Sequence, residues 1–285
     1  MTPVIDAEDL GTWWAGVADI LLQEARHADS EYDNLRLLMD AARVRAEECS
    51  DLDGGYSVYL ECHQIAPRNP RVLRALARLC CKREDWASAK DWLEKCVAEE
   101  GDALIRTEIK LELAELLAMR LGESREALEV LWSALDETPQ SEGALLMLAL
   151  LLGESDLEGQ AELLRRRLVL VKEPEDRINV LLQLGHIESL RGGEGGEALT
   201  AYQEAYALDN TRWASVLGVY RCLIEAANWP DLQIFVSDAI AAAPGGEAAS
   251  RLRLLYEVLQ GTHFGEVTDP STLHALESVL GQDLN

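Results

Sequence analysis

The strongest constraint in this 285-residue sequence is a helix–turn–helix pattern that returns about every 34 residues. Apolar side chains recur at three- and four-residue spacing, which places them on one face of an α-helix. The first helix of each pair is expected to begin near residues 36, 70, 108, 141, 178 and 211, so the intervals are 34, 38, 33, 37 and 33 residues. Two short helices cannot bury their apolar faces alone, whereas a stack of such pairs buries a continuous core.

The clearest pair spans residues 69–101, where a polar break at 83–85 separates two amphipathic helices. Pro70 stands in the first turn, where proline is tolerated, and the second helix is marked by Trp86, Ala89, Leu93 and Cys96. Glycine or proline stands at the other expected helix ends. The sequence therefore predicts a capping helix within residues 1–35, an array of about six units over 36–244, and capping helices over 245–285.

Composition is consistent with an all-α chain and limits the classes of molecule that the chain can bind. Apolar residues make up 48% of the sequence, which excludes a disordered chain. The formal net charge of −25 argues against binding to nucleic acid or to anionic lipid. We expect no signal peptide, because no basic start precedes an apolar core, and no membrane span, because the longest apolar run is residues 144–152. Six cysteines without framework spacing predict reduced thiols and a cytoplasmic protein.

The helix pairs resemble the tetratricopeptide repeat family, which has Leu-Gly in the first helix and spaced alanine and aromatic positions in the second. The matching positions are Leu184, Gly185, Ala198, Tyr202 and Ala205, then Leu217 and Gly218, then Ala127, Leu131, Ala134 and Pro139, and the 69–101 pair. The unit at residue 55 keeps only the second half of the pattern, and the unit at residue 141 lacks Leu-Gly. The resemblance implies a right-handed α-solenoid whose glycines and alanines lie where helices approach closely.

No stretch of the sequence predicts catalysis. The five histidines are scattered and form no metal-binding motif, and the glycines of residues 192–196 follow a helix and lack the lysine of a phosphate loop. We therefore expect no enzyme activity, no metal site and no cofactor.

A basic stripe is the most informative feature for function. Residues 69–101 carry a net charge of +1, between a preceding segment of −9 and a following segment of −17. Within them, Arg71, Arg74, Arg78 and Lys82 are spaced by three, four and four residues, so they share one side of a helix. The family resemblance places that side on the concave groove, where partner peptides bind. It is not the two-carboxylate clamp of some relatives, which needs other residue types at these places.

Two interpretations of the stripe remain open. The four cations form a site for a partner's carboxylate, acidic side chains or phosphate, since Arg suits bidentate contacts. Alternatively they form internal ion pairs, because the repeat register aligns Arg74 with Asp40 of the preceding unit and Glu112 of the next.

Smaller candidates lie elsewhere. A second set of polar groove residues is expected to hydrogen-bond an extended peptide or to form a solvated face: Asn179, Gln183, His186 and Arg212. We expect Arg165, Arg166 and Arg167 to be surface charge. Trp13 and Trp14 either cap the first repeat or anchor a partner.

The sequence thus predicts a non-catalytic scaffold or adaptor that binds a protein or peptide, with an acidic or carboxylate-bearing segment as one expected ligand. The alternative is a regulatory or substrate-recruiting subunit of an enzyme complex. RNA binding is a weaker third possibility, because of the charge. The partner and the oligomeric state are not predicted.

Overall fold

The computed structural model describes residues 7–192 and 196–242, together with residues 250 and 253. Within these residues every regular element is helical and there is no strand, so the predicted all-α class is confirmed. The chain divides into two compact units, residues 1–151 and residues 152–285. The predicted capping helices over 245–285 fall almost entirely outside the described residues.

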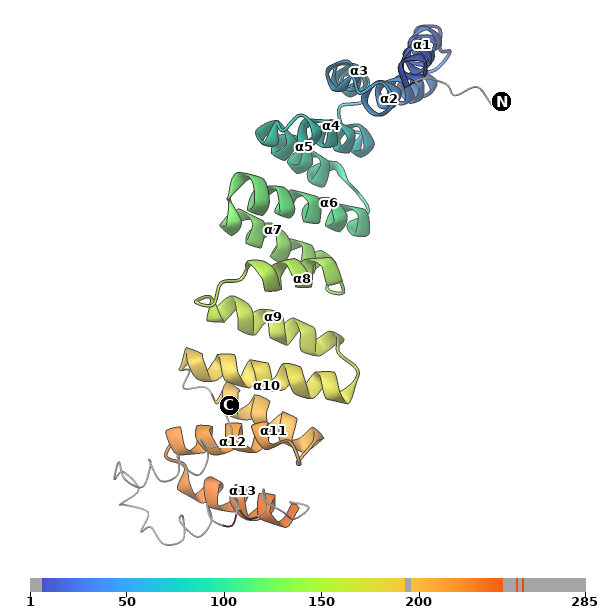
Figure 1. Ribbon diagram of the computed structural model, residues 1–285. Coiled ribbons are helices and arrows are strands. Elements are labelled where there is room, and N and C mark those ends of the chain that lie inside the picture. The colour runs from blue at the N-terminus through green and yellow to red at the C-terminus, as the bar shows by residue number, and fades with distance from the viewer. Residues whose placement is uncertain (1–6, 193–195, 243–249, 251–252, 254–285) are drawn as a thin grey trace. The chain divides into compact units, whose positions relative to one another are not determined.

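The first unit holds α1 to α8, and each helix packs mainly on its neighbours in the chain (Figure 1). The helices are α1 (Ala7–Arg26), α2 (Glu31–Glu47), α3 (Leu52–Ile65), α4 (Pro70–Lys82), α5 (Trp86–Glu99), α6 (Ala103–Leu116), α7 (Ser124–Glu137) and α8 (Glu142–Leu151). A short π-helical turn, η1 (Leu117–Leu121), continues α6. One core cluster runs through α1 to α4 and includes Ala42, Cys62 and Leu76.

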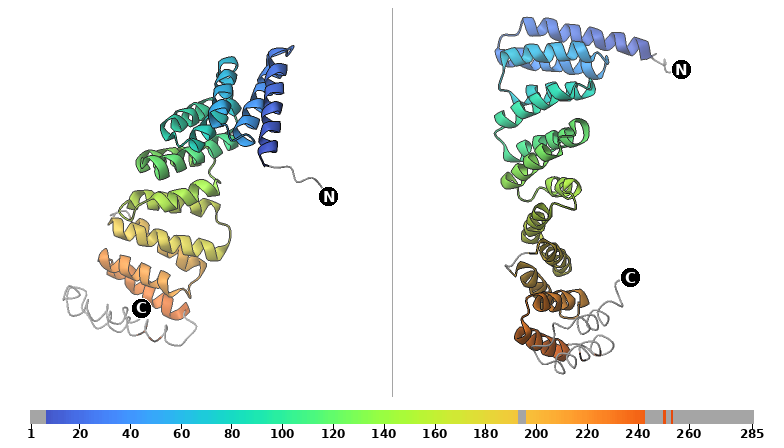
Figure 2. Two further views of the ribbon diagram at one scale, coloured as in Figure 1. Left: turned by 45° about the horizontal axis from the view of Figure 1, so that its top comes forward. Right: turned by 90° about the vertical axis from the view of Figure 1, so that its left-hand side faces the viewer.

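The second unit repeats this arrangement with α9 (Leu157–Leu170), α10 (Pro174–Arg191), α11 (Glu197–Leu208), α12 (Trp213–Glu225) and α13 (Trp229–Ala242). Its helices also pack in chain order, and Figure 2 shows the layers of each unit from two further sides. One core cluster joins α9, α10 and α11, and another joins α12 and α13. Successive antiparallel pairs of this kind are the stacked hairpins that the repeat predicts.

N-terminal caps move several helix starts away from the positions that the sequence suggested. The pair expected to begin near residue 36 begins at residue 31 with α2, because the Asp33 amide donates to Ser30 Oγ at 3.0 Å. At the start of α3 the Gly54 amide donates to Asp51 Oδ1 at 2.8 Å, so that this helix begins at residue 52. Pro174 lies beyond the end of α9, as its position suggests, and also opens α10 ahead of the start expected near residue 178.

Tyr202 fills the space between two glycines, as the repeat pattern implies. Its ring, on α11, lies against Gly185 of α10 and Gly218 of α12. A β-carbon added to Gly185 would lie 2.8 Å from the ring, and one added to Gly218 would lie 2.3 Å from it. Both helices can approach α11 this closely only because neither carries a side chain there.

The division into two units falls between α8 and α9, inside the repeat that begins near residue 141. This is the repeat that lacks the Leu-Gly pair. A single continuous array over residues 36–244 remains a prediction.

A methyl group at Gly218 should destabilise the second unit by about 1–3 kcal/mol, because it meets the root of the Tyr202 ring at Cγ and Cδ1. Gly16→Ala in α1 is the matched control, since nothing lies within 4 Å of its added carbon and alanine favours a helix by up to about 1 kcal/mol. Urea unfolding followed by circular dichroism measures both. Equal midpoints for Gly218→Ala and the parent would disprove this close packing, and Gly185→Trp should be more disruptive than either.

Candidate binding site on the first unit

The basic stripe lies on one side of α4, and the apolar residues of this helix face its neighbours on the other side. Asn69 caps the helix by accepting from the Arg71 amide at 3.0 Å, and Pro70 occupies its first turn. The residues that α4 buries against its neighbours are Val72, Leu73, Leu76, Ala77, Leu79 and Cys80. The cations between them are left on the opposite side, toward solvent.

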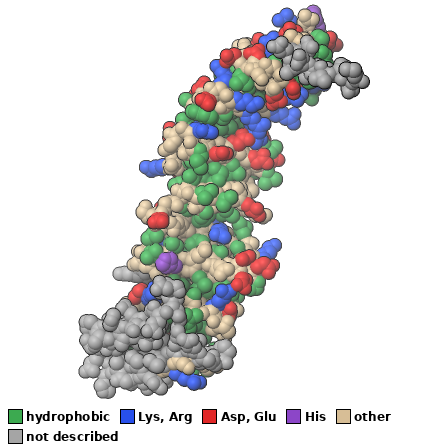
Figure 3. Space-filling model, in the orientation of Figure 1, with side chains coloured by type: hydrophobic (Ala, Val, Ile, Leu, Met, Phe, Trp, Pro, Cys, Tyr) green, Lys and Arg blue, Asp and Glu red, His purple; other side chains and the backbone are tan. Residues whose placement is uncertain are grey.

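All four stripe residues line one hollow of about 600 Å³. Arg43 of α2 joins them, and Glu47 is the one acidic residue in the lining, which also includes Ala46, Tyr59, Ala75, Leu79 and Cys81. Figure 3 shows Lys and Arg side chains gathered at the level of α4 on the face that it draws. The sequence interpretation missed Arg43, although the repeat register aligns its neighbour Val44 with Arg78.

Two of the four cations also form internal ion pairs. Arg74 donates to Glu112 of α6 at 2.7 and 3.2 Å and lies 3.5 Å from Glu108, while Arg78 donates to Glu112 at 3.2 Å. The predicted pairing of Arg74 with the next unit is therefore present. Asp40 instead lies 3.6 Å from Arg43, on its own helix.

The Arg74–Glu112 pair shifts the pKa of both partners. The hydrogen bond to Glu112 raises the pKa of Arg74. Burial opposes ionisation of Glu112, but hydrogen bonds from Arg74 and Arg78 outweigh it and lower the pKa of that carboxyl. The pair therefore favours the ionised form of both side chains.

Arg71 and Lys82 differ from these two. Both side chains are exposed, and neither has an acidic partner within 4 Å in the part of the chain that the structure describes. They stand at the two ends of the stripe, so the hollow has unneutralised positive charge at both ends of α4. An anionic group from outside the chain can pair with them without displacing an internal partner.

The thiols around the hollow are not nucleophiles. Burial raises the pKa of Cys81, in the lining, and of Cys80 beside it. Burial also raises the pKa of Cys62 to about 12 and of Cys96 to about 11. A thiol with such a pKa stays protonated near neutral pH, so these residues favour packing over chemistry.

The second predicted set of groove residues, on α10 and at the start of α12, includes three exposed side chains and one arginine that is ion-paired within the fold. Asn179, Gln183 and His186 are exposed on α10 and follow one another at four- and three-residue spacing, so they share a face. Arg212 is instead held in ion pairs with Glu175 and, at 3.4 Å, with Asp209. Of the four predicted residues, Arg212 thus already has acidic partners within the second unit.

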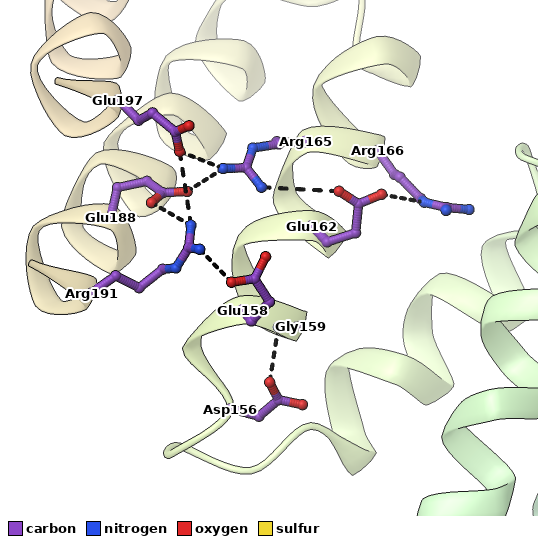
Figure 4. A network of polar contacts seen from close by, with 9 residues as sticks. All are labelled: Asp156, Glu158, Gly159, Glu162, Arg165, Arg166, Glu188, Arg191 and Glu197. Atoms are coloured by element: carbon purple, nitrogen blue, oxygen red, sulfur yellow. Dashed lines mark hydrogen bonds and ion pairs between the residues drawn. The ribbon is translucent and has the colours of Figure 1, made fainter. Parts of the chain in front are cut away.

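Arg165 is structural and not simple surface charge, contrary to expectation. It donates to Glu188 of α10 at 2.5 Å and to Glu197 at the start of α11 at 2.6 Å. Arg191 donates to the other oxygen of Glu188 at 2.7 Å and also pairs with Glu158 (Figure 4). Glu188 is only 6% exposed, so two guanidinium groups compensate its buried charge.

The tryptophan pair of α1 packs edge to face, with ring centroids 4.5 Å apart. Trp13 remains 59% exposed. Both roles considered for it, capping and anchoring, remain open.

The described residues include neither a metal-binding cluster nor a helix suited to cross a membrane. Among the described residues, no group of three or more His, Cys, Asp and Glu side chains could hold a metal ion. No described helix combines the length and the apolar character that crossing a membrane requires.

Acidification should weaken the first unit through Glu112. Because its pKa in the folded chain lies below the ordinary 4.5, the pair contributes stability above that pH and loses it as pH falls through the folded value. Between pH 5 and about pH 3, Glu112→Gln should show a shallower loss of unfolding free energy than Glu129→Gln, an exposed carboxylate on α7. Equal slopes in urea titrations would contradict the pairing.

Comparison with known proteins gives remote structural likenesses. No family model matches the sequence, and no curated protein matches it. A tetratricopeptide repeat protein from Parabacteroides merdae aligns at 14% identity and a TM-score of 0.40, covering 86% of this chain and 98% of that one. The Cut9–Hcn1 hetero-tetramer of APC/C aligns at 14% identity and 0.38, covering 88% and 48%.

An O-GlcNAc transferase from Thermobaculum terrenum aligns at 17% identity and a TM-score of 0.33, covering 56% of this chain and 27% of that one. The chain thus spans about half of the Cut9 chain and about a quarter of the transferase. What carries the assignment is the chain's own architecture, in which alternate helices from α2 to α12 begin 32 to 39 residues apart and Tyr202 packs between the glycines of two Leu-Gly pairs. The described helices thus form an all-α fold of stacked helix pairs that resembles the tetratricopeptide repeat.

Proposed function

We propose that the chain is a non-catalytic protein-interaction module, and that a carboxylate-bearing segment of a partner binds in the cationic hollow of α2 and α4. The observation that carries the proposal is that Arg71 and Lys82 have no acidic partner among the described residues and lie in a hollow that Arg43, Arg74 and Arg78 also line. Guanidinium groups hold carboxylates with two parallel hydrogen bonds, which gives direction as well as charge.

The rest of the unit supports this assignment by contrast. Lys90 bridges Glu123 and Glu126, each at 2.8 Å, and Lys110 pairs with Glu137 at 2.5 Å. Cations that serve the packing of neighbouring helices thus have acidic partners within the fold. Arg71 and Lys82 line a hollow and make no such contact with the residues that the structure describes, which is the expected state of a site that awaits an anion from another molecule.

The proposal includes a reducing compartment, in keeping with the cytoplasm. All six cysteines are free thiols. An oxidising compartment would favour disulfides in a chain of this kind. Whether the module acts as an adaptor or recruits substrates to an enzyme, the same hollow would make the contact.

Charge reversal at the two free cations tests the site. Arg71→Glu with Lys82→Glu should weaken binding of a fluorescein-labelled hexaglutamate peptide at least tenfold, because an attractive contact becomes repulsive at both ends of the hollow. The control is Arg167→Glu with Lys172→Glu in the second unit, since both side chains are exposed and have no acidic partner among the described residues. Fluorescence anisotropy at 25 and 150 mM NaCl measures both.

The control should change affinity less than twofold, although it alters net charge by the same amount. Equal losses in the two variants would mean that the peptide senses only the overall charge, and the proposal would fail. It would also fail if the parent chain bound hexaglutamate no better than hexaserine at 25 mM NaCl. Affinity capture from lysate with the same two variants then identifies the partners that depend on the hollow.

A further inference from the structure

A second hollow adjoins the first. It has a volume of about 540 Å³ and shares Arg78 and Cys81 with the cationic hollow. Its apolar lining comes from α4, α5, α6 and η1, namely Ala77, Trp86, Leu93, Leu116 and Met119. Its polar lining comprises Glu112, Glu115 and Arg120 in addition to Arg78. The two hollows therefore lie on either side of these α4 residues.

The π-helical turn η1 shapes the rim of the second hollow. The α-helical hydrogen bonding of α6 gives way to a π-helical turn over Leu117–Leu121, which ends at Gly122 with a positive φ of 73°. Such turns widen a helix locally and occur often at functional sites. Here the turn carries Met119 and Arg120, two of the lining residues, and leaves Met119 67% exposed.

Two side chains of η1, Arg120 and Met119, shape the rim for an apolar guest. The Arg120 guanidinium carbon lies 4.9 Å from the centre of the Trp86 ring, a cation–π contact that orients the ring. Met119 brings an unbranched, adaptable thioether that can close over side chains of different shape. An exposed methionine beside a tryptophan is a surface that gains from burial.

We propose that the second hollow binds one bulky aliphatic side chain of the same partner segment whose carboxylates bind in the first. This inference rests on the proposed function. The ligand is therefore a stretch of protein in which acidic residues adjoin a leucine-like residue. Charge complementarity favours such a segment, because cations line one hollow while apolar side chains line most of the other.

Glu112 and Glu115 set the direction of the segment. Both carboxylates line the second hollow, and neither lines the first. In the second hollow these two carboxylates balance Arg78 and Arg120, whereas the first hollow has five cations and one carboxylate. Acidic residues of a ligand are therefore attracted to the first hollow, and the second favours a neutral apolar residue.

Leucine scanning of the acidic peptide tests the inference. In a series based on labelled hexaglutamate, leucine replaces glutamate at one position at a time, and alanine at the same position serves as the reference. At the best position leucine should bind about tenfold more tightly than alanine, since part of an apolar side chain leaves water. Anisotropy at 150 mM NaCl measures the ratio.

A matched pair of variants tests whether the tighter binding of leucine arises in the second hollow. Met119→Ser should remove most of the leucine advantage and leave binding of hexaglutamate within about twofold. Leu104→Ser in α6 is the control, because Leu104 is 66% exposed in the same unit and lies outside both hollows. It should keep the full advantage.

Four outcomes would overturn the inference. If hexaglutamate binds but no leucine position gains, the second hollow is not an anchor site, although the proposed function stands. If Met119→Ser keeps the gain, the anchor binds elsewhere. If a peptide with phosphoserine in place of each glutamate binds more than tenfold tighter, the site is built for phosphate. If light scattering shows a parent dimer that Met119→Ser dissociates, the occupant is a second copy of the chain.

Discussion

Close approach of helices at small side chains is the constraint on which the rest of this structure depends. Gly55 of α3 lies so near α2 that an added β-carbon would come within 2.9 Å of Ala46, and Gly185 and Gly218 enclose Tyr202 in the same way. At these points no larger residue fits, so the packing of one helix fixes the position of the next. The first hollow, lined by α2, α3 and α4, includes Ala46, the residue that Gly55 approaches.

Ion pairs between successive layers act on top of this packing. Lys110 of α6 is 5% exposed and donates to Ser133 and Glu137 of α7, and Glu188 of α10 is enclosed by Arg165 and Arg191. Each buried charge needs its partner, because a lone ion inside a protein costs several kcal/mol. Such pairs fix which helix neighbours which, and they neutralise much of the basic charge internally. The free cations at the ends of the α4 stripe stand outside this arrangement.

Much of this architecture could be predicted from the sequence, because it follows from residue type and spacing. The repeat interval gave the helix pairs, and the Leu-Gly and tyrosine positions gave the contact around Tyr202. The four stripe residues could be assigned to one face of one helix, since periodicity alone decides that. The repeat register also aligned Arg74 with Glu112, so an ion pair between them was one of the two interpretations of the stripe.

What the sequence could not predict depends on distances between side chains. Arg212 pairs with Glu175 and Arg165 with Glu188 because the helices that carry them meet at a particular register, and spacing in the sequence does not fix the rotamers. The π-helical turn after α6 is likewise a local change of backbone hydrogen bonding that no residue pattern marks. Arg43 enters the hollow from another helix, so only the packed structure brings it to the stripe.

A cationic hollow within a chain of net charge −25 can attract an anion only at short range. At physiological salt, charges beyond about 8 Å are largely screened, so a carboxylate at the hollow responds to the cations of its lining and only weakly to the acidic remainder. Glu112 already occupies Arg74 and Arg78 from the side of the second hollow. An incoming carboxylate must therefore share those two cations and find its unshared partners at Arg71 and Lys82. Because two of the cations are shared in this way, a ligand needs several well-placed contacts to bind. An apolar anchor beside its acidic residues would therefore determine which segments bind.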